Sequence, residues 1–159
     1  MKRLWKALGA ILVCLILLLI ALRITGFGPH DRIPGLWLKG NVVPAPVTDW
    51  SFTDNIPVVQ IQTQTWYVLP HAVNINCLEY NGQLYLVSVY PAGTTHSWNE
   101  NVMRDPHVRL KIGDNIYDRT VSLVTDQAEQ EGVLQARHKK YPQLKIPANP
   151  TIHVFHVAG

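Results

Sequence analysis

The sequence has almost none of the residue patterns that mark a metal centre or a nucleophilic active site. It has only two cysteines and no H-E-x-x-H, C-x-x-C or G-x-S-x-G pattern, which argues against a dedicated zinc site or a serine hydrolase. Cys77 lies in a predicted strand without a basic neighbour to activate it, so we interpret it as a buried apolar residue. His153 and His156 fall on opposite faces of a predicted strand and cannot share an ion. We therefore predict no metal site.

An excess of charge of one sign is also missing once the N-terminus is set aside. Four of the 14 Lys and Arg residues lie in the first 23 positions, and the other 10 nearly balance the 11 Asp and Glu residues. The pI near 9.0 therefore comes from the N-terminus. The rest of the chain carries no basic footprint, and we predict no nucleic-acid partner.

The first 24 residues are predicted to form a transmembrane signal-anchor. Lys2, Arg3 and Lys6 precede an uninterrupted apolar run from Ala7 to Leu22, long enough with its flanks to cross a bilayer as one helix. A cleavable signal peptide is the alternative, but no small-residue cleavage pattern follows Leu22. Since basic residues stay in the cytoplasm, we expect a single pass in a bacterial inner membrane with the C-terminal domain in the periplasm.

Residues 25–46 are predicted to be a linker, and residues 47–159 a single domain. The linker is rich in proline and glycine, which disfavour regular structure. Its apolar stretch from Pro34 to Leu38 is expected to pack on the domain or to rest at the membrane interface. The following stretch is long enough for one hydrophobic core.

The domain is predicted to contain mostly antiparallel strands. Asn81-Gly82 between two apolar runs is the strongest short-range hairpin signal, and a second turn is expected near Gly113-Asp114-Asn115. A helix over 126–141 is indicated by acidic residues early and basic residues late, which complement its dipole. Strands are predicted at residues 57–65, 72–80, 83–89, 107–112, 116–124 and 151–157.

The segment from Ser97 to Ile112 sets the order of elements. Ser97 with Glu100 matches a capping box at a helix start, and Asp105-Pro106 ends that helix. From His107 to Ile112 apolar and polar residues alternate, as in a half-buried strand. This order favours a small antiparallel β-barrel with flanking helices, mainly β, behind the N-terminal transmembrane helix.

Several of these residues resemble one family. The strand opening at Ile56-Pro57-Val58, the pairs Val73-Asn74 and Asn81-Gly82, and the W-x-x-N-x-x-x-D-P pattern from Trp98 to Pro106 resemble the deazaflavin-dependent nitroreductase and quinone-reductase family. That family belongs to the split β-barrel group with the pyridoxamine-phosphate-oxidase-like flavin proteins. The resemblance extends from about residue 56 to residue 142.

The resemblance implies a flavin or deazaflavin held against the barrel and a quinone-like small molecule as hydride acceptor. It also implies that a homodimer is a common arrangement. By position, the implied cofactor-binding residues are Thr63, Trp66, Tyr67, Asn74, Tyr90, Gly93, Trp98 and Asn101. No catalytic residue is assigned.

For some of these residues a structural role is the competing interpretation. Trp98 either stacks on a ligand or anchors its helix, and Asn101 either positions a ligand or bonds to neighbouring backbone. Trp66, Tyr67 and Tyr90 either line an apolar cleft or fill a closed groove.

The chain departs from the family pattern where cations would grip an anionic cofactor tail. A turn that is basic in the family is here Thr65 to Leu69, and the run after the second hairpin strand is Tyr90 to Gly93. The sequence therefore leaves open whether the chain is an enzyme. The alternative is a non-catalytic envelope protein whose split barrel binds an apolar ligand or a partner.

Overall fold

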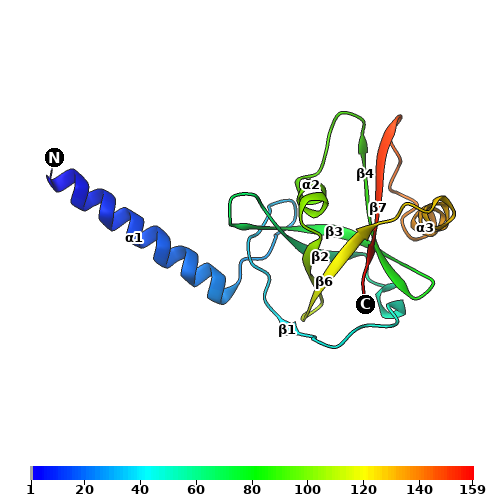
Figure 1. The fold of residues 1–159 in the computed structure, drawn as a ribbon, viewed down its shortest axis with the longest axis horizontal. Helices are drawn as coiled ribbons and strands as arrows, with labels where there is room; N and C mark the ends of the chain where they lie inside the picture. The colour runs from blue at the N-terminus through cyan, green and yellow to red at the C-terminus, as the bar shows by residue number, and fades with distance from the viewer. Residues whose placement is uncertain (1) are drawn as a thin grey trace.

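Helix α1 (Lys2–Thr25) extends away from the rest of the chain, as Figure 1 shows for the computed structural model, which describes residues 2–159. Its stretch Arg3–Thr25 is long and apolar enough to cross a membrane, and none of it is buried against the domain. The length agrees with the predicted span of residues 1–24. An apolar helix that finds no protein partner is what a membrane segment requires.

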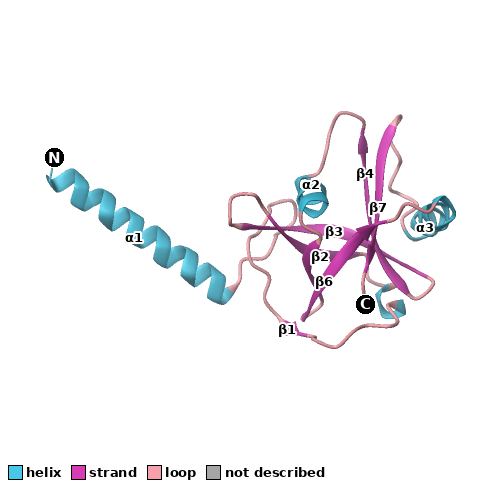
Figure 2. Ribbon diagram, in the orientation of Figure 1, coloured by secondary structure: helices cyan, strands magenta, loops and turns pink. Residues whose placement is uncertain are grey.

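Seven strands and three short helices form the remainder (Figure 2). In chain order these are β1 (Asn41–Val42), the 3₁₀ turn η1 (Ser51–Thr53), β2 (Val58–Gln64), β3 (Pro70–Tyr80), β4 (Gln83–Pro91), α2 (Ser97–Arg104), β5 (His107–Ile112), β6 (Asn115–Leu123), α3 (Gln127–Lys140) and β7 (Pro150–Val157).

Six of the strands close into an antiparallel barrel. They pair in the order β6-β5-β2-β3-β4-β7, and β7 returns to pair with β6. The short strand β1 adds to β6 in parallel. The predicted split β-barrel with flanking helices is therefore confirmed.

Both predicted hairpin turns are present. Asn81 and Gly82 have φ values of 53° and 76°, which a two-residue turn of this kind requires at both positions. Gly113 also has a positive φ, of 60°, between β5 and β6. In α3, the Asp126 side chain accepts a hydrogen bond of 2.7 Å from the Glu129 backbone N–H, as expected of an N-cap residue.

The predicted capping box at Ser97 is wrong by one position. His96 occupies the N-cap of α2 and Ser97 is already helical, with no side-chain cap bond. The Ser97 hydroxyl lies instead 3.3 Å from the ring Nε2 of His71 on β3. The Ser97 hydroxyl therefore contacts a side chain on another element and does not cap the backbone of its own helix.

The barrel interior is apolar over most of its length. Inward-facing residues such as Ile61, Leu86 and Leu110 are fully buried, and Trp98 and Val102 of α2 join the same cluster. Helix α3 covers the outside of the barrel, where Val133 packs against Leu78, Tyr85, Val124 and Val154. In β5, Val108, Leu110 and Ile112 are buried, as the alternating pattern predicted.

The segment between α1 and β1 lies against the barrel. Gly35 pairs with Ala72 on β3 through two backbone hydrogen bonds, and the buried Leu38 backbone N–H donates to the side-chain oxygen of Gln62 at 2.7 Å. The stretch from Pro34 to Leu38 thus packs on the domain.

Candidate functional site

The candidate site lies where β3 and β4 separate. These strands pair only from Cys77–Tyr80 to Gln83–Leu86. Toward the other end, β3 continues along β2 and β4 continues along β7. Within the described part of the chain, no strand pairs with the β4-facing edge of residues 73–76.

A cleft of about 890 Å³ occupies this split. Its walls are residues 73–76 of β3 and 87–89 of β4, residues 31–33 of the linker, the start of α2 at 95–98, and the end of α3 with the loop after it. The size is near the upper end of the range for small-molecule and cofactor sites.

A buried hydroxyl without a hydrogen-bond partner lies in the cleft wall. Ser88 is only 3% exposed, and its Oγ has no partner in the structure. Leaving a buried hydroxyl unpaired costs about 1–3 kcal/mol. A bound molecule that supplies the missing hydrogen bond would remove that cost.

Three cations line the same cleft, one from the linker and two from a distant part of the sequence. Arg32 comes from the linker, Arg137 from α3 and Lys145 from the loop after α3, against the single carboxylate of Asp31. Burial lowers the pKa of Arg137 from its usual value, although a guanidinium stays charged in proteins. The lining therefore carries excess positive charge suited to an anionic group.

Beside the cleft, α2 makes polar contacts with the barrel end. The Tyr90 hydroxyl lies 3.2 Å from His153 Nδ1, and the same nitrogen lies 3.1 Å from the Asn99 side-chain oxygen. The His96 ring packs at a tilt against Tyr90, with centroids 5.3 Å apart. Burial lowers the pKa of His71, which contacts the start of α2. This network holds α2 in place, with its first residues in the cleft wall.

Two of the eight residues predicted for cofactor binding line the cleft, namely Asn74 and Trp98. The side-chain amide of Asn74 already donates to the backbone oxygen of Asp31 at 3.0 Å. Trp98 is 5% exposed and packs edge-on against Phe155 in the core, so it also anchors α2 to the barrel.

The other six predicted residues lie outside the cleft lining. The Asn101 amide donates to the Thr63 hydroxyl at 3.0 Å, which ties α2 to β2. Tyr90 belongs to the network above, and Gly93 lies in the turn after β4 with a φ of 81°. Trp66 and Tyr67 are exposed at the β2–β3 connection, where they neither line the cleft nor fill a groove.

The sequence analysis did not identify Ser88 or the three cations, although the sequence pattern around Ser88 and Arg137 indicates where their side chains lie. Ser88 follows Leu84 and Leu86 at alternating positions of one strand, so it must face inward with them. Arg137 looked like part of a solvated helix end, yet it lies four residues from the buried Val133 and from the buried Tyr141. That spacing puts it on the face of α3 turned to the barrel.

Comparison with known proteins gives structural relatives only. No family model matches the sequence, and no curated protein matches it. Among solved structures, the chain is similar to an F420-H2 dependent reductase, with 25% identity over 64% of this chain and 94% of that chain and a TM-score of 0.50.

Two further solved structures have the same fold. One is a domain-swapped dimer with 27% identity, covering 64% of this chain and 80% of that chain, with a TM-score of 0.52. The other is a proposed pyridoxamine 5′-phosphate oxidase from Listeria innocua with 21% identity, covering 68% and 87%, with a TM-score of 0.52. The chain therefore resembles the flavin- and deazaflavin-binding split barrels, as its sequence predicted.

Proposed function

We propose that the chain is a membrane-anchored split-barrel oxidoreductase whose cleft binds a flavin or deazaflavin. The observation that carries this proposal is the positive lining of the cleft by Arg32, Arg137 and Lys145. These residues replace the cations that are missing from the family's own positions. The likeness to a reductase that depends on F420-H2 supports the same class of ligand.

The residues of the cleft suit both parts of such a molecule. The cations would hold its anionic tail, while the Ser88 hydroxyl and the unpaired edge of β3 at residues 73–76 would donate to or accept from its ring. When bound, the cofactor would supply hydride transfer to a small acceptor, and a quinone-like molecule suits an enzyme attached to a membrane. The chain's own task is to orient the ring and exclude water.

The proposal includes the membrane arrangement. Helix α1 would cross a bacterial inner membrane once, with Arg3 and Lys6 on the cytoplasmic side and the barrel in the periplasm. A homodimer is part of the proposal, because one of the similar structures is a domain-swapped dimer. A reporter enzyme fused after Gly159 that works only in the periplasm would support this topology, and one that works in the cytoplasm would contradict it.

A non-catalytic ligand-binding role is the second candidate. It is favoured by the linker, which already uses the amide of Asn74 and pairs with β3 at Ala72. In this role the cleft would hold an apolar molecule or a partner segment and carry out no redox chemistry.

The direct test is a titration of the purified full chain with flavin mononucleotide and with a deazaflavin, followed by cofactor fluorescence. We expect saturable binding that Arg137→Gln weakens about tenfold, since one charged contact is worth roughly 1.4 kcal/mol. Lys139→Gln is the matched control, because it removes the same charge from an exposed position on the same helix. No binding of either cofactor, or equal loss in both variants, would reject the proposal.

A further inference from the structure

The β2–β3 connection exposes large apolar side chains that nothing in the domain covers. Trp66 is 81% exposed, Tyr67 49% and Val68 89%. We call these three residues the aromatic tip. Exposed apolar groups gathered in one place mark a contact surface more often than chance.

The aromatic tip is held in this shape and is not a loose loop. The Thr65 hydroxyl donates to the Leu69 backbone oxygen, and the Leu69 N–H donates to the Tyr67 oxygen at 2.9 Å. The rings of Trp66 and Tyr67 pack edge-on with centroids 5.2 Å apart. Val68 has a φ of 75°, a conformation that is costly for a β-branched residue. The fold thus maintains an exposed, strained apolar turn.

The aromatic tip lies at the edge of the domain from which α1 extends. Figure 1 shows the β2–β3 connection at the edge of the domain from which the helix extends, whereas α3 lies at the opposite edge. If α1 crosses a bilayer, this edge is the part of the domain turned toward the membrane surface. Tryptophan and tyrosine are the residues most enriched at that depth.

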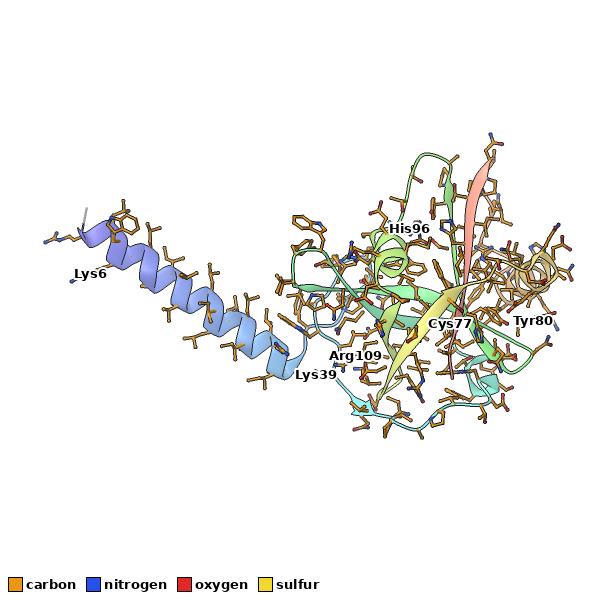
Figure 3. The ribbon with its side chains drawn as sticks, viewed as in Figure 1. Lys6, Lys39, Cys77, Tyr80, His96 and Arg109 are labelled. Carbon is orange, nitrogen blue, oxygen red and sulfur yellow. The ribbon has the colours of Figure 1, made fainter. Side chains whose placement is uncertain are left out.

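Cations surround the point where α1 meets the domain. Arg23, Lys39 and Arg119 line a groove of about 750 Å³, together with an Arg109–Asp118 ion pair. The Lys39 side chain lies against Gly26, which directly follows α1, and Figure 3 shows it next to the end of the helix. Within residues 2–159, the side chains of Arg23 and Lys39 form no hydrogen bond and no ion pair.

We propose that this edge of the domain is a second membrane contact, in which the aromatic tip enters the bilayer interface and Arg23 and Lys39 bind anionic lipid headgroups. The inference rests on the proposed membrane anchor. A bilayer is favoured over a second copy of the chain because the β2–β3 connection lies at the edge of the domain from which α1 extends (Figure 1), and because three side chains are too few for a stable dimer interface. The contact would fix how the barrel stands on the membrane.

Spin labelling of the full chain in lipid vesicles tests the proposal. A nitroxide is placed at Val68→Cys in a Cys14→Ala background, since Cys77 is buried, and the vesicles contain phosphatidylcholine and phosphatidylglycerol. We expect the label to collide with oxygen at least several times more readily, relative to a water-soluble nickel complex, than a label at Ile146→Cys. Ile146 is exposed and lies in the loop after α3, the helix that Figure 1 shows at the opposite edge of the domain.

A third label at Ile16→Cys separates failure of this inference from failure of the anchor. If the label at 16 lies in lipid while those at 68 and 146 are equally accessible to nickel, the aromatic tip does not touch the membrane and the proposal is overturned. Dipolar coupling between labels at 68 in detergent would assign the tip to a second copy, which also overturns it. A label at 16 exposed to water would remove the anchor and this inference with it.

The cationic part has its own readout. Replacing Arg23 and Lys39 by glutamine should reduce the oxygen preference of the label at 68 in vesicles with phosphatidylglycerol and leave it unchanged in phosphatidylcholine alone, since only the charged surface attracts the cations. Equal behaviour in both lipids would overturn the headgroup contact.

Discussion

The two ends of the β3–β4 pair differ in strand pairing and in the side chains that they bury. At the end near Gly82 the strands are hydrogen-bonded to each other, and Leu84 and Leu86 are fully buried. Two residues further along β4, the strands have parted and Ser88 faces the cleft with an unpartnered hydroxyl. Strand β4 thus supplies core packing at Leu86 and, two residues later, lines the cleft at Ser88.

The difference separates the well-packed part of the strand pair from the cleft that we propose binds a ligand. At the paired end, apolar burial and satisfied hydrogen bonds lower the free energy of the folded state. At the split end, the buried Ser88 hydroxyl has no hydrogen-bond partner and Arg137 is partly desolvated, and both raise the free energy of the folded state. Substitutions at the two ends should therefore separate the free energy of unfolding from ligand affinity.

The largest expected effect is Leu86→Ala at the paired end. It removes a fully buried side chain from the barrel core, and we expect the free energy of unfolding to fall by about 2–5 kcal/mol. Urea denaturation of the full chain measures this. Leu123→Ala, at a position 39% exposed, should cost less than about 0.5 kcal/mol. Similar losses in the two variants would contradict the assignment of the paired end as the main source of stability.

Tyr141→Phe should have the next largest effect. The Tyr141 hydroxyl contacts the backbone oxygens of Pro57 and Cys77, and its removal leaves a buried acceptor unpaired, at a cost of about 1–2 kcal/mol. Burial, with a smaller contribution from Cys77, raises the pKa of Tyr141 to about 12 from 10.0. The folded phenol therefore keeps its proton in the range where the unfolded one loses it.

This pKa shift predicts an alkaline dependence of stability. The contribution of Tyr141 is complete below pH 10 and decreases as the pH rises from 10 to about 12, because only the unfolded chain gives up the proton in that window. Denaturation curves should show a smaller decrease over this range in Tyr141→Phe than in the wild type. An identical pH dependence in the two proteins would show that the phenol is not buried as described.

Ser88→Ala should have the smallest effect on folding and a selective effect on binding. Removing a buried hydroxyl that has no partner should leave the free energy of unfolding unchanged or raise it by up to about 1 kcal/mol. Cofactor affinity should fall several-fold, measured by the same fluorescence titration, and Ser122→Ala on an exposed site is the control. A loss of stability with unchanged affinity would make Ser88 a structural residue and weaken the comparison between the two ends.

Much of the fold was predictable because its signals are local. The Asn81-Gly82 turn, the alternation in β5 and the dipole pattern of α3 each depend on neighbours in sequence, and the structure confirms them. The capping box at Ser97 failed for the opposite reason. The Ser97 hydroxyl contacts His71, which lies 26 positions away in the chain. A local sequence pattern cannot predict a hydrogen-bond partner at that separation.

The candidate site was less predictable because its parts come together only in the folded chain. Asn74, which the family resemblance named, lies in the cleft wall, and the alternation of β4 could have pointed to Ser88, but Arg32 and Lys145 belong to irregular segments with no periodic pattern to place them. The exposed position of Trp66 and Tyr67 was also out of reach, since sequence cannot tell an aromatic that lines a cleft from one at the tip of a hairpin.

By itself the sequence determined an apolar N-terminal helix, six of the strands, the two longer helices of the domain and the split-barrel class. The helices and strands follow from hydrophobic period, turn chemistry or helix-end charges, which act over a few residues, and the split-barrel class was implied by the family resemblance. Only the tertiary structure decided that β3 and β4 separate beyond the Cys77–Leu86 pair and that the linker pairs with Ala72. It also decided that cations from the linker, from α3 and from the loop after α3 line one cleft. These features depend on contacts between segments that are distant in the sequence, and short-range sequence patterns do not reveal such contacts.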